Sequence, residues 1–305
     1  MIFGLVLLAS LQQTPTFGAE VRFVEVDALV TRDGRVVPGL RAEDFELFDN
    51  GVVQAVEVVT GPGAPANVLL LLDLSESVAG ERLERLKAAT RALLRALAPQ
   101  DHATLLTFAN EIQWRGGPTS DFGSLEGALD RLAAGGLTRL HDAVFTALFL
   151  GDRRYGRPVV FAFSDGEDSG SWLLAEQLQK AARGADAVLN AARLALDDAD
   201  RAYLPDASSE YTGSAGRVRT ISPQPQGPRR RPSPLLAELA DLTGGRVWAA
   251  GDGDALKRAF LAALDETRGR YLLRYEPRGV ARGWHELKVR LKVRGELRAR
   301  RGYQD

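Results

Sequence analysis

The chain has 305 residues, of which 45% are hydrophobic and 26% are charged, and its formal net charge is −1. This balance is typical of a globular protein and excludes the disordered, collagenous and multi-span membrane classes. The absence of cysteine excludes disulfide scaffolds and thiolate metal sites, and with only three scattered histidines any bound metal must be held by oxygen.

The first residues resemble an export signal. Ile2 to Leu11 form an apolar run too short to span a membrane, and polar residues and a proline follow it before Glu20. We therefore predict a signal peptide at residues 1–19 and an exported protein, periplasmic, cell-surface-associated or secreted, with no transmembrane span after signal removal. A buried first strand is the alternative, because no Lys or Arg precedes the apolar run.

The next segment, residues 20–62, is predicted to consist of β-strands. Residues 21–30 alternate between apolar and polar, residues 52–59 form a β-branched run, and the turn signals Asp33-Gly34 and Asp49-Asn50-Gly51 lie between them. Glycine and proline in residues 61–65 then mark a linker.

From residue 67 onward, apolar runs of strand length alternate with stretches of helical spacing. This alternation predicts a doubly wound, mostly parallel sheet in an α/β domain at residues 63–268, with a surface insertion at residues 197–233 that is rich in Pro, Ser and Gly. The expected strands are residues 68–72, 103–108, 158–163, 187–196 and 247–249, and the expected helices are residues 81–98, 122–132, 140–150, 172–183, 234–242 and 254–267.

The C-terminal segment, residues 269–305, returns to strand periodicity. Residues 271–275 and 285–293 alternate, and the second run has an apolar face and a basic face. Neither terminal segment can form a core alone, so we expect the two to form one small β-sandwich around the inserted α/β domain. The basic run Arg229–Arg231 has no aromatic stacking platform beside it, so we expect no nucleic-acid partner.

Five oxygen-bearing side chains are expected at one rim of the predicted sheet. Asp73, Ser75 and Ser77 follow the strand at residues 68–72, Asp165 follows the strand at residues 158–163, and Thr138 precedes a helix. Carboxylates acting partly through water beside neutral hydroxyls suit Mg²⁺, with Mn²⁺ or Ca²⁺ as alternatives. Such a cation keeps an exchangeable position that attracts an external carboxylate.

This order of residues resembles the von Willebrand factor type A (VWFA) family, whose metal-ion-dependent adhesion site reads D-x-S-x-S, then Thr, then Asp. All five positions match, and the resemblance covers roughly Asn67 to Arg268. Residues 39–51 and 300–303 look like bacterial VWFA-related proteins of the acidobacterial type. The resemblance implies a Rossmann-like fold and a non-enzymatic adhesion or protein-binding module that captures an Asp or Glu of a partner.

Two other functions compete with this one. A structural spacer in an envelope assembly would keep the fold without using the site. A Mg²⁺-dependent hydrolase of the haloacid-dehalogenase type needs a second Asp where this chain has Ser75, and a hydroxyl cannot act as that general acid. Phosphate-binding glycine loops and the G-x-S-x-G elbow are missing.

Three acids near the expected site have open roles. Asp142 either orients ligands from behind or is a helix-start acid favoured by the helix dipole. Glu167 and Asp168 are interpreted as parts of a solvated turn, with a tuning of specificity as the alternative.

Overall fold

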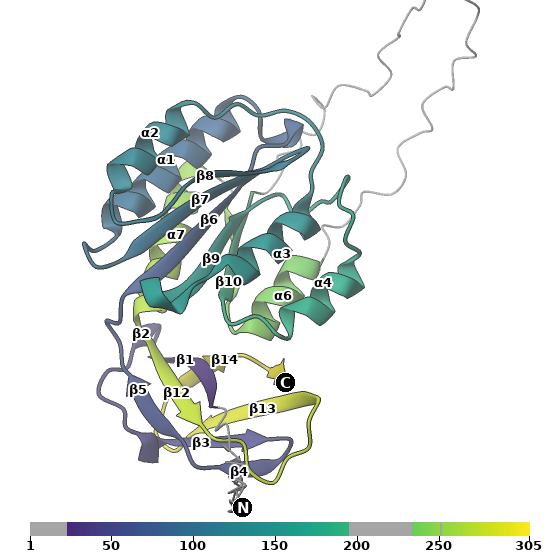
Figure 1. Cartoon of the computed structure of the whole chain (residues 1–305). Helices are drawn as coiled ribbons and strands as arrows, with labels where there is room; N and C mark the ends of the chain where they lie inside the picture. The colour runs from purple at the N-terminus through teal and green to yellow at the C-terminus, as the bar shows by residue number, and fades with distance from the viewer. Residues whose placement is uncertain (1–22, 195–233, 251) are drawn as a thin grey trace, which may run out of the picture.

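The computed structural model describes residues 23–194, 234–250 and 252–305. It contains an α/β layer and a β-sandwich, and the chain enters and leaves the layer through the sandwich (Figure 1). The predicted signal at residues 1–19 and the predicted insertion at residues 197–233 fall outside these ranges. Within them, no helix combines the length and the apolar character that a membrane span requires.

The α/β layer is built on one six-stranded sheet. In spatial order its strands are β11 (Val247–Ala250), β10 (Val188–Leu194), β9 (Arg157–Phe163), β6 (Ala66–Asp73), β7 (His102–Phe108) and β8 (Ile112–Thr119). Pairing is parallel from β11 to β7, and β8 runs antiparallel along the edge. All eight residues of β6 are buried, as expected for an apolar strand that is covered on both faces.

Helices cover both faces of this sheet (Figure 1). One face carries α1 (Glu81–Ala96), α2 (Phe122–Asp130) and α7 (Gly253–Arg268), and the other carries α3 (Leu140–Leu150), α4 (Ala175–Ala182) and α6 (Leu235–Thr243). In α1 the leucines at positions 83, 86, 93 and 94 are buried, because their helical spacing puts them on one stripe. The doubly wound, mostly parallel architecture predicted from the sequence is therefore confirmed.

The terminal segments form a β-sandwich of two sheets. The first sheet contains β1 (Val24–Arg32), β2 (Arg35–Val36), β5 (Glu57–Thr60), β12 (Arg270–Tyr275) and β14 (Glu296–Ala299), and the second contains β3 (Phe45–Asp49), β4 (Val52–Gln54), β13 (Trp284–Leu291) and β15 (Gly302–Gln304). Each sheet joins strands from both ends of the chain: β1 pairs with β12, and β3 pairs with β13. The predicted single sandwich is thus confirmed, with one shared core between the sheets.

A buried arginine connects the sandwich to the α/β layer. Arg157, the first residue of β9, lies with its Nε 2.9 Å from Oδ1 of Asp27 in β1. Its guanidinium also donates to the carbonyl of Arg270 at 2.8 Å and to Oγ1 of Thr60 at 2.9 Å. Burial lowers the pKa of Arg157, and the charge of Asp27 opposes that shift. The two parts of the molecule therefore share a charged, desolvated contact.

Several segments differ from the sequence-based prediction. The run at residues 52–59 forms two strands, β4 and β5, in different sheets. Strand β8 was not predicted; it contains Pro118, which is tolerated at the sheet edge because no partner requires its missing N–H. The helix expected over residues 172–183 begins only at Ala175. After residue 295 the chain forms β14 in the first sheet of the sandwich and β15 in the second.

Candidate metal centre

The strand order brings two polar loops to one rim of the sheet. Strands β6 and β9 are hydrogen-bonded neighbours, but the chain leaves β6 toward β7 and leaves β9 toward β10, on opposite sides. Open α/β sheets bind ligands at such a switch point, beyond the carboxyl ends of the strands. Asp73 is the last residue of β6, and Asp165 follows β9 by two positions. Both carboxylates therefore stand at the switch point.

Asp73 is completely buried. Its Oδ1 accepts the N–H of Ser75 at 2.8 Å, and its Oδ2 accepts the hydroxyl of Ser164 at 2.8 Å. Burial raises the pKa of the Asp73 carboxyl to about 6 and the negative charge of Asp165 adds to the shift, while the hydrogen bonds from Ser75 and Ser164 oppose it. The site thus contains a carboxylate that is held in place but poorly compensated.

Two hydroxyls connect the two acids. Ser77 Oγ donates to Oδ2 of Asp165 at 2.8 Å, and the Oγ atoms of Ser75 and Ser77 lie 3.2 Å apart. The N–H of Glu167 donates to Oδ1 of Asp165 at 3.0 Å and fixes the turn after β9. Four of the five predicted ligands therefore form one connected group.

The fifth predicted ligand, Thr138, lies on a loop that packs between the other two. Gly135 N–H donates to the Leu74 carbonyl at 2.7 Å, and Glu76 N–H donates to the Gly136 carbonyl at 3.1 Å. On its other side, Thr138 N–H donates to Oγ of Ser169 at 2.9 Å. Among the described residues its hydroxyl has no hydrogen bond to the other four ligands, so Thr138 is linked to them through its loop only.

This donor set fits a hard divalent cation. In the described part of the chain, no basic side chain forms an ion pair with Asp73 or Asp165, and no group of three or more His, Asp or Glu residues could hold a metal. Any metal at this rim would therefore depend on hydroxyl oxygens beside two carboxylates. Mg²⁺ accepts such an all-oxygen shell and keeps waters in it.

Two acids with open roles turn out to organise the neighbouring loop. Asp142 forms hydrogen bonds to the loop after β9 rather than to the predicted ligands. Its Oδ2 accepts the N–H of Trp172 at 3.0 Å, and its Oδ1 accepts the N–H of Leu173 at 2.9 Å. Asp168 is not a solvated turn residue, since its Oδ1 accepts the hydroxyl of Ser171 at 2.5 Å and the N–H of His141 at 3.2 Å. Glu167 is exposed, as a turn residue should be.

Ser164 is the functional residue that sequence reasoning missed. It is completely buried, donates to Asp73 and accepts the N–H of Gly166 at 3.1 Å. A signal was present, because a serine directly after the apolar run of β9 and before Asp165 must lie at the same rim as Asp73. Its partner could be known only once β6 and β9 were shown to be neighbours.

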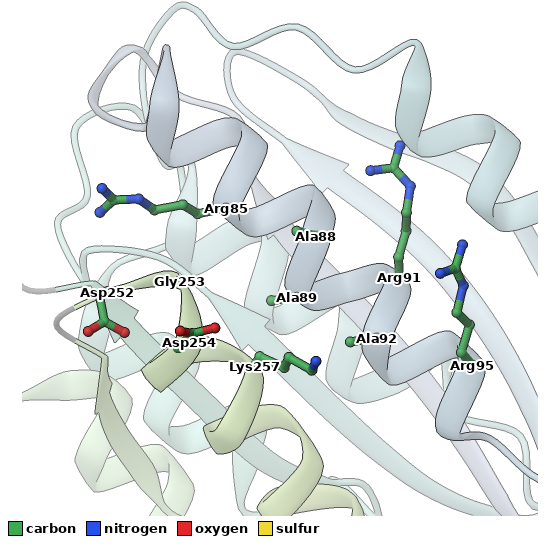
Figure 2. A pocket seen from close by; sticks show the side chains of 10 residues that line it. All are labelled: Arg85, Ala88, Ala89, Arg91, Ala92, Arg95, Asp252, Gly253, Asp254 and Lys257. Carbon is green, nitrogen blue, oxygen red and sulfur yellow. The ribbon is translucent and has the colours of Figure 1, made fainter.

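A second concave feature lies away from these residues. A cavity of about 880 Å³ between α1 and α7 has a floor of alanines and charged walls (Figure 2). Two of its arginines from α1 form ion pairs with α2. Arg95 donates through Nε and Nη2 to the two carboxylate oxygens of Glu126 at 2.9 and 2.8 Å, and Arg91 pairs with Asp130. None of the five predicted ligands lines this cavity.

Comparison with known families identifies the α/β layer. The model of the von Willebrand factor type A domain matches residues 68–167, a stretch that runs from β6 past β9 and includes all five predicted ligands. Residues 68–167 are therefore similar to a von Willebrand factor type A (VWA) domain, and we call the α/β layer that contains them the VWA domain.

Solved structures are similar to this chain at the level of the fold. A von Willebrand factor type A protein from Catenulispora acidiphila aligns with a TM-score of 0.50 and 11% identity, over 92% of this chain and 73% of that one. An aerotolerance-related membrane protein from Bacteroides fragilis aligns with a TM-score of 0.46 and 18% identity, over 66% and 99%. Proximal thread matrix protein 1 of the mussel byssus, in a structure with a zinc-occupied MIDAS motif, aligns with a TM-score of 0.49 and 15% identity, over 72% and 49%.

Proposed function

We propose that this protein is a non-enzymatic, metal-dependent module that binds a partner protein through its VWA domain. Asp73, Ser75, Ser77, Thr138 and Asp165 would hold one Mg²⁺, with Mn²⁺ or Ca²⁺ as alternatives. When bound, the cation supplies a Lewis-acidic position for an Asp or Glu carboxylate of the partner. The protein's own part is to hold the five oxygens and to keep Asp73 away from bulk water.

The observation that carries the proposal is the state of Asp73. This carboxylate is completely buried, has no basic partner among the described residues and is connected through the hydroxyls of Ser75 and Ser77 to a second acid. Leaving a buried charge uncompensated costs several kcal/mol, on the order of the penalty for an unpaired ion in a protein interior. A divalent cation removes that cost, which is a physical reason for a chain to retain this arrangement.

An enzyme is a weaker proposal for the same site. Ser75 stands where a phosphatase of the aspartyl type needs its second acid, and its Oγ lies against Ser77 rather than against a base. The nearest histidine along the Thr138 loop, His141, contacts the carbonyl of Leu173 through Nδ1 at 2.8 Å. A serine nucleophile requires a base within hydrogen-bond reach, and neither contact provides one.

Export and subfamily remain part of the proposal. We infer an exported protein, periplasmic, surface-associated or secreted, from the apolar segment within residues 1–19, and membership of the bacterial VWFA-related proteins from the flanking motifs. A role as a spacer in an envelope assembly is the second candidate function, and it is favoured only by the direct connection of the VWA domain to the sandwich.

Titration calorimetry with Mg²⁺ and Mn²⁺ tests the metal site. Wild type should bind one divalent ion per chain, Asp73→Ala should show no heat of binding, and Asp254→Asn, an exposed acid at the start of α7, should behave like wild type. Equal heats from wild type and Asp73→Ala would refute the metal site. Hydrolase activity that disappears in Ser75→Ala would favour the enzyme instead.

A further inference from the structure

The metal site is bordered by unusually exposed apolar side chains. Trp172 and Leu174, at 81% and 65% exposure, are the two most exposed large hydrophobic residues in the described part of the chain, and Leu137 is 54% exposed. Leu137 directly precedes Thr138, and Trp172 and Leu174 lie on the loop that begins with Asp165. We call these three residues the apolar rim. Single exposed apolar residues are ordinary, but these three come from two loops of the site that hydrogen-bond to each other.

The rim is held rigidly despite its exposure. The Asp142 carboxylate accepts the N–H groups of both Trp172 and Leu173, and His141 Nδ1 lies 2.8 Å from the Leu173 carbonyl. Leu173 packs inward against the core, so its neighbours on either side are directed outward. The backbone that carries Trp172 is therefore ordered before a partner arrives, which lowers the entropic cost of binding there.

The rim is also tied directly to the ligand loops. The N–H groups of Ser169 and Gly170 donate to the Thr138 carbonyl at 2.9 and 3.0 Å. Gly170 also lies beside Leu137, since a Cβ at Gly170 would stand in ordinary contact with Cβ of Leu137 at 3.4 Å. The Arg139 guanidinium lies 5.9 Å from the centre of the Trp172 ring and 4.0 Å from Oδ2 of Asp142, so a partly compensated positive charge stands beside the rim.

We propose that the apolar rim binds an aliphatic or aromatic side chain of the same partner whose carboxylate reaches the metal. The occupant is thus a protein segment with an Asp or Glu next to an apolar residue, because Arg139 and the cation complement the acid and the rim complements its neighbour. This inference rests on the proposed function, whose partner chemistry it narrows. The apolar rim would set the specificity for particular acidic segments, while the cation held by the five predicted ligands would be required for binding of any of them.

Selection from a random peptide library displayed on phage tests the proposal. The full chain is used as bait in Mg²⁺, and bound phage are eluted with EDTA. We expect the recovered peptides to contain an acidic residue with an apolar residue at a short, fixed spacing. Trp172→Ser/Leu174→Ser should recover acidic peptides without that apolar residue, and it should bind the best wild-type peptide at least tenfold more weakly.

Two controls separate the rim from general effects. Trp114→Ser removes another exposed tryptophan, 51% exposed on edge strand β8, and should leave peptide preference unchanged. The double rim variant should keep the wild-type heat of Mg²⁺ binding, because among the described residues no hydrogen bond or ion pair joins the side chains of Trp172 and Leu174 to the five predicted ligands.

The outcomes are distinct. Metal-dependent peptides without an apolar residue, or the same apolar preference in wild type and the double variant, would overturn the rim proposal and leave the proposed function intact. No EDTA-sensitive peptide from wild type would overturn both. A wild-type dimer that becomes monomeric in the double variant, measured by light scattering, would identify a second copy as the occupant and overturn the peptide proposal.

Discussion

At the scale of single residues, the site is a place where the chain accepts an unfavourable charge. Asp73 is fully buried with a raised pKa, and its oxygens accept hydrogen bonds from Ser75 and from the hydroxyl of Ser164 but, within the described residues, pair with no basic group. Functional sites often sacrifice stability in this way. Substitutions at Asp73 and Ser164 can therefore separate the stability cost of the buried charge from the proposed metal binding.

Asp73→Asn should have opposite effects with and without metal. Asparagine keeps an acceptor for Ser75 N–H but removes the buried charge beside Asp165, so we expect a higher melting temperature than wild type in EDTA. In saturating Mg²⁺ the order should reverse, because only wild type gains binding free energy. Thermal unfolding by circular dichroism measures both, with Asp254→Asn as a control that should match wild type throughout. A lower melting temperature than wild type in EDTA would contradict this view of Asp73.

Ser164→Ala should weaken metal binding without unfolding the protein. The substitution deletes the hydroxyl that orients Oδ2 of Asp73, and loss of such an outer contact commonly lowers metal affinity about 10- to 100-fold. Ser120→Ala, at an exposed serine before α2, is the matched control and should bind as wild type does. Wild-type affinity in Ser164→Ala by calorimetry would show that Asp73 needs no support from β9.

At the scale of elements, close backbone contacts set the geometry of the sheet. Gly245, between α6 and β11, lies so near β10 that a Cβ would stand 1.9 Å from the Leu189 carbonyl oxygen. Gly244 before it ends α6 with a left-handed φ of 85° and donates to the Asp241 carbonyl. The pairing of β10 with β11 therefore depends on a missing side chain.

Gly245→Ala and Gly127→Ala should change stability in opposite directions. The first forces β10 and β11 apart and should cost at least about 1–3 kcal/mol in the free energy of unfolding. The second lies in α2, where a Cβ meets nothing within 4 Å, and should stabilise by about 0.5–1 kcal/mol. Urea denaturation compares both with wild type, and a neutral Gly245→Ala would mean that the strand pair can shift at little cost.

At the scale of the whole molecule, the VWA domain and the sandwich are joined by buried charge. Arg157 is the shared element, since it pairs with Asp27 and donates to backbone and hydroxyl groups on β12 and β5. A buried pair of this kind contributes little net stability, yet breaking it leaves one charge stranded. Replacing one of the two residues should therefore lower the free energy of unfolding strongly, and replacing both should lower it much less.

Arg157→Met should destabilise the protein by about 3–5 kcal/mol, because Asp27 then remains buried without its partner. The double variant Asp27→Leu/Arg157→Met should recover most of that loss. Arg154→Met, which removes a surface pair with Asp152, should cost less than about 1 kcal/mol. Urea unfolding followed by tryptophan fluorescence gives all three values, and equal losses in the single and double variants would rule out the stranded charge as the cause.

Much of this architecture could be predicted from the sequence, for identifiable reasons. The apolar run of β6 and the helical spacing of α1 reveal their periods directly, and the D-x-S-x-S order with Thr138 and Asp165 predicts which loops form the candidate site. Strand β8 could not be predicted, because its residues are half exposed and only the edge of β7 makes them a strand. The same holds for Trp172, which lies in a loop because Asp142 accepts its N–H, a contact between residues 30 positions apart.

The neighbouring position of β5 and β12 has a consequence for how such a protein can vary. Thr60 and Leu272 are register partners, so the chain departs for the VWA domain and returns from it on adjacent strands. The more than two hundred residues between them are therefore inserted between two adjacent antiparallel strands, in the place that a hairpin loop would occupy. Related proteins could therefore carry a longer, shorter or different inserted domain while the sandwich keeps the hydrogen bonds between its strands.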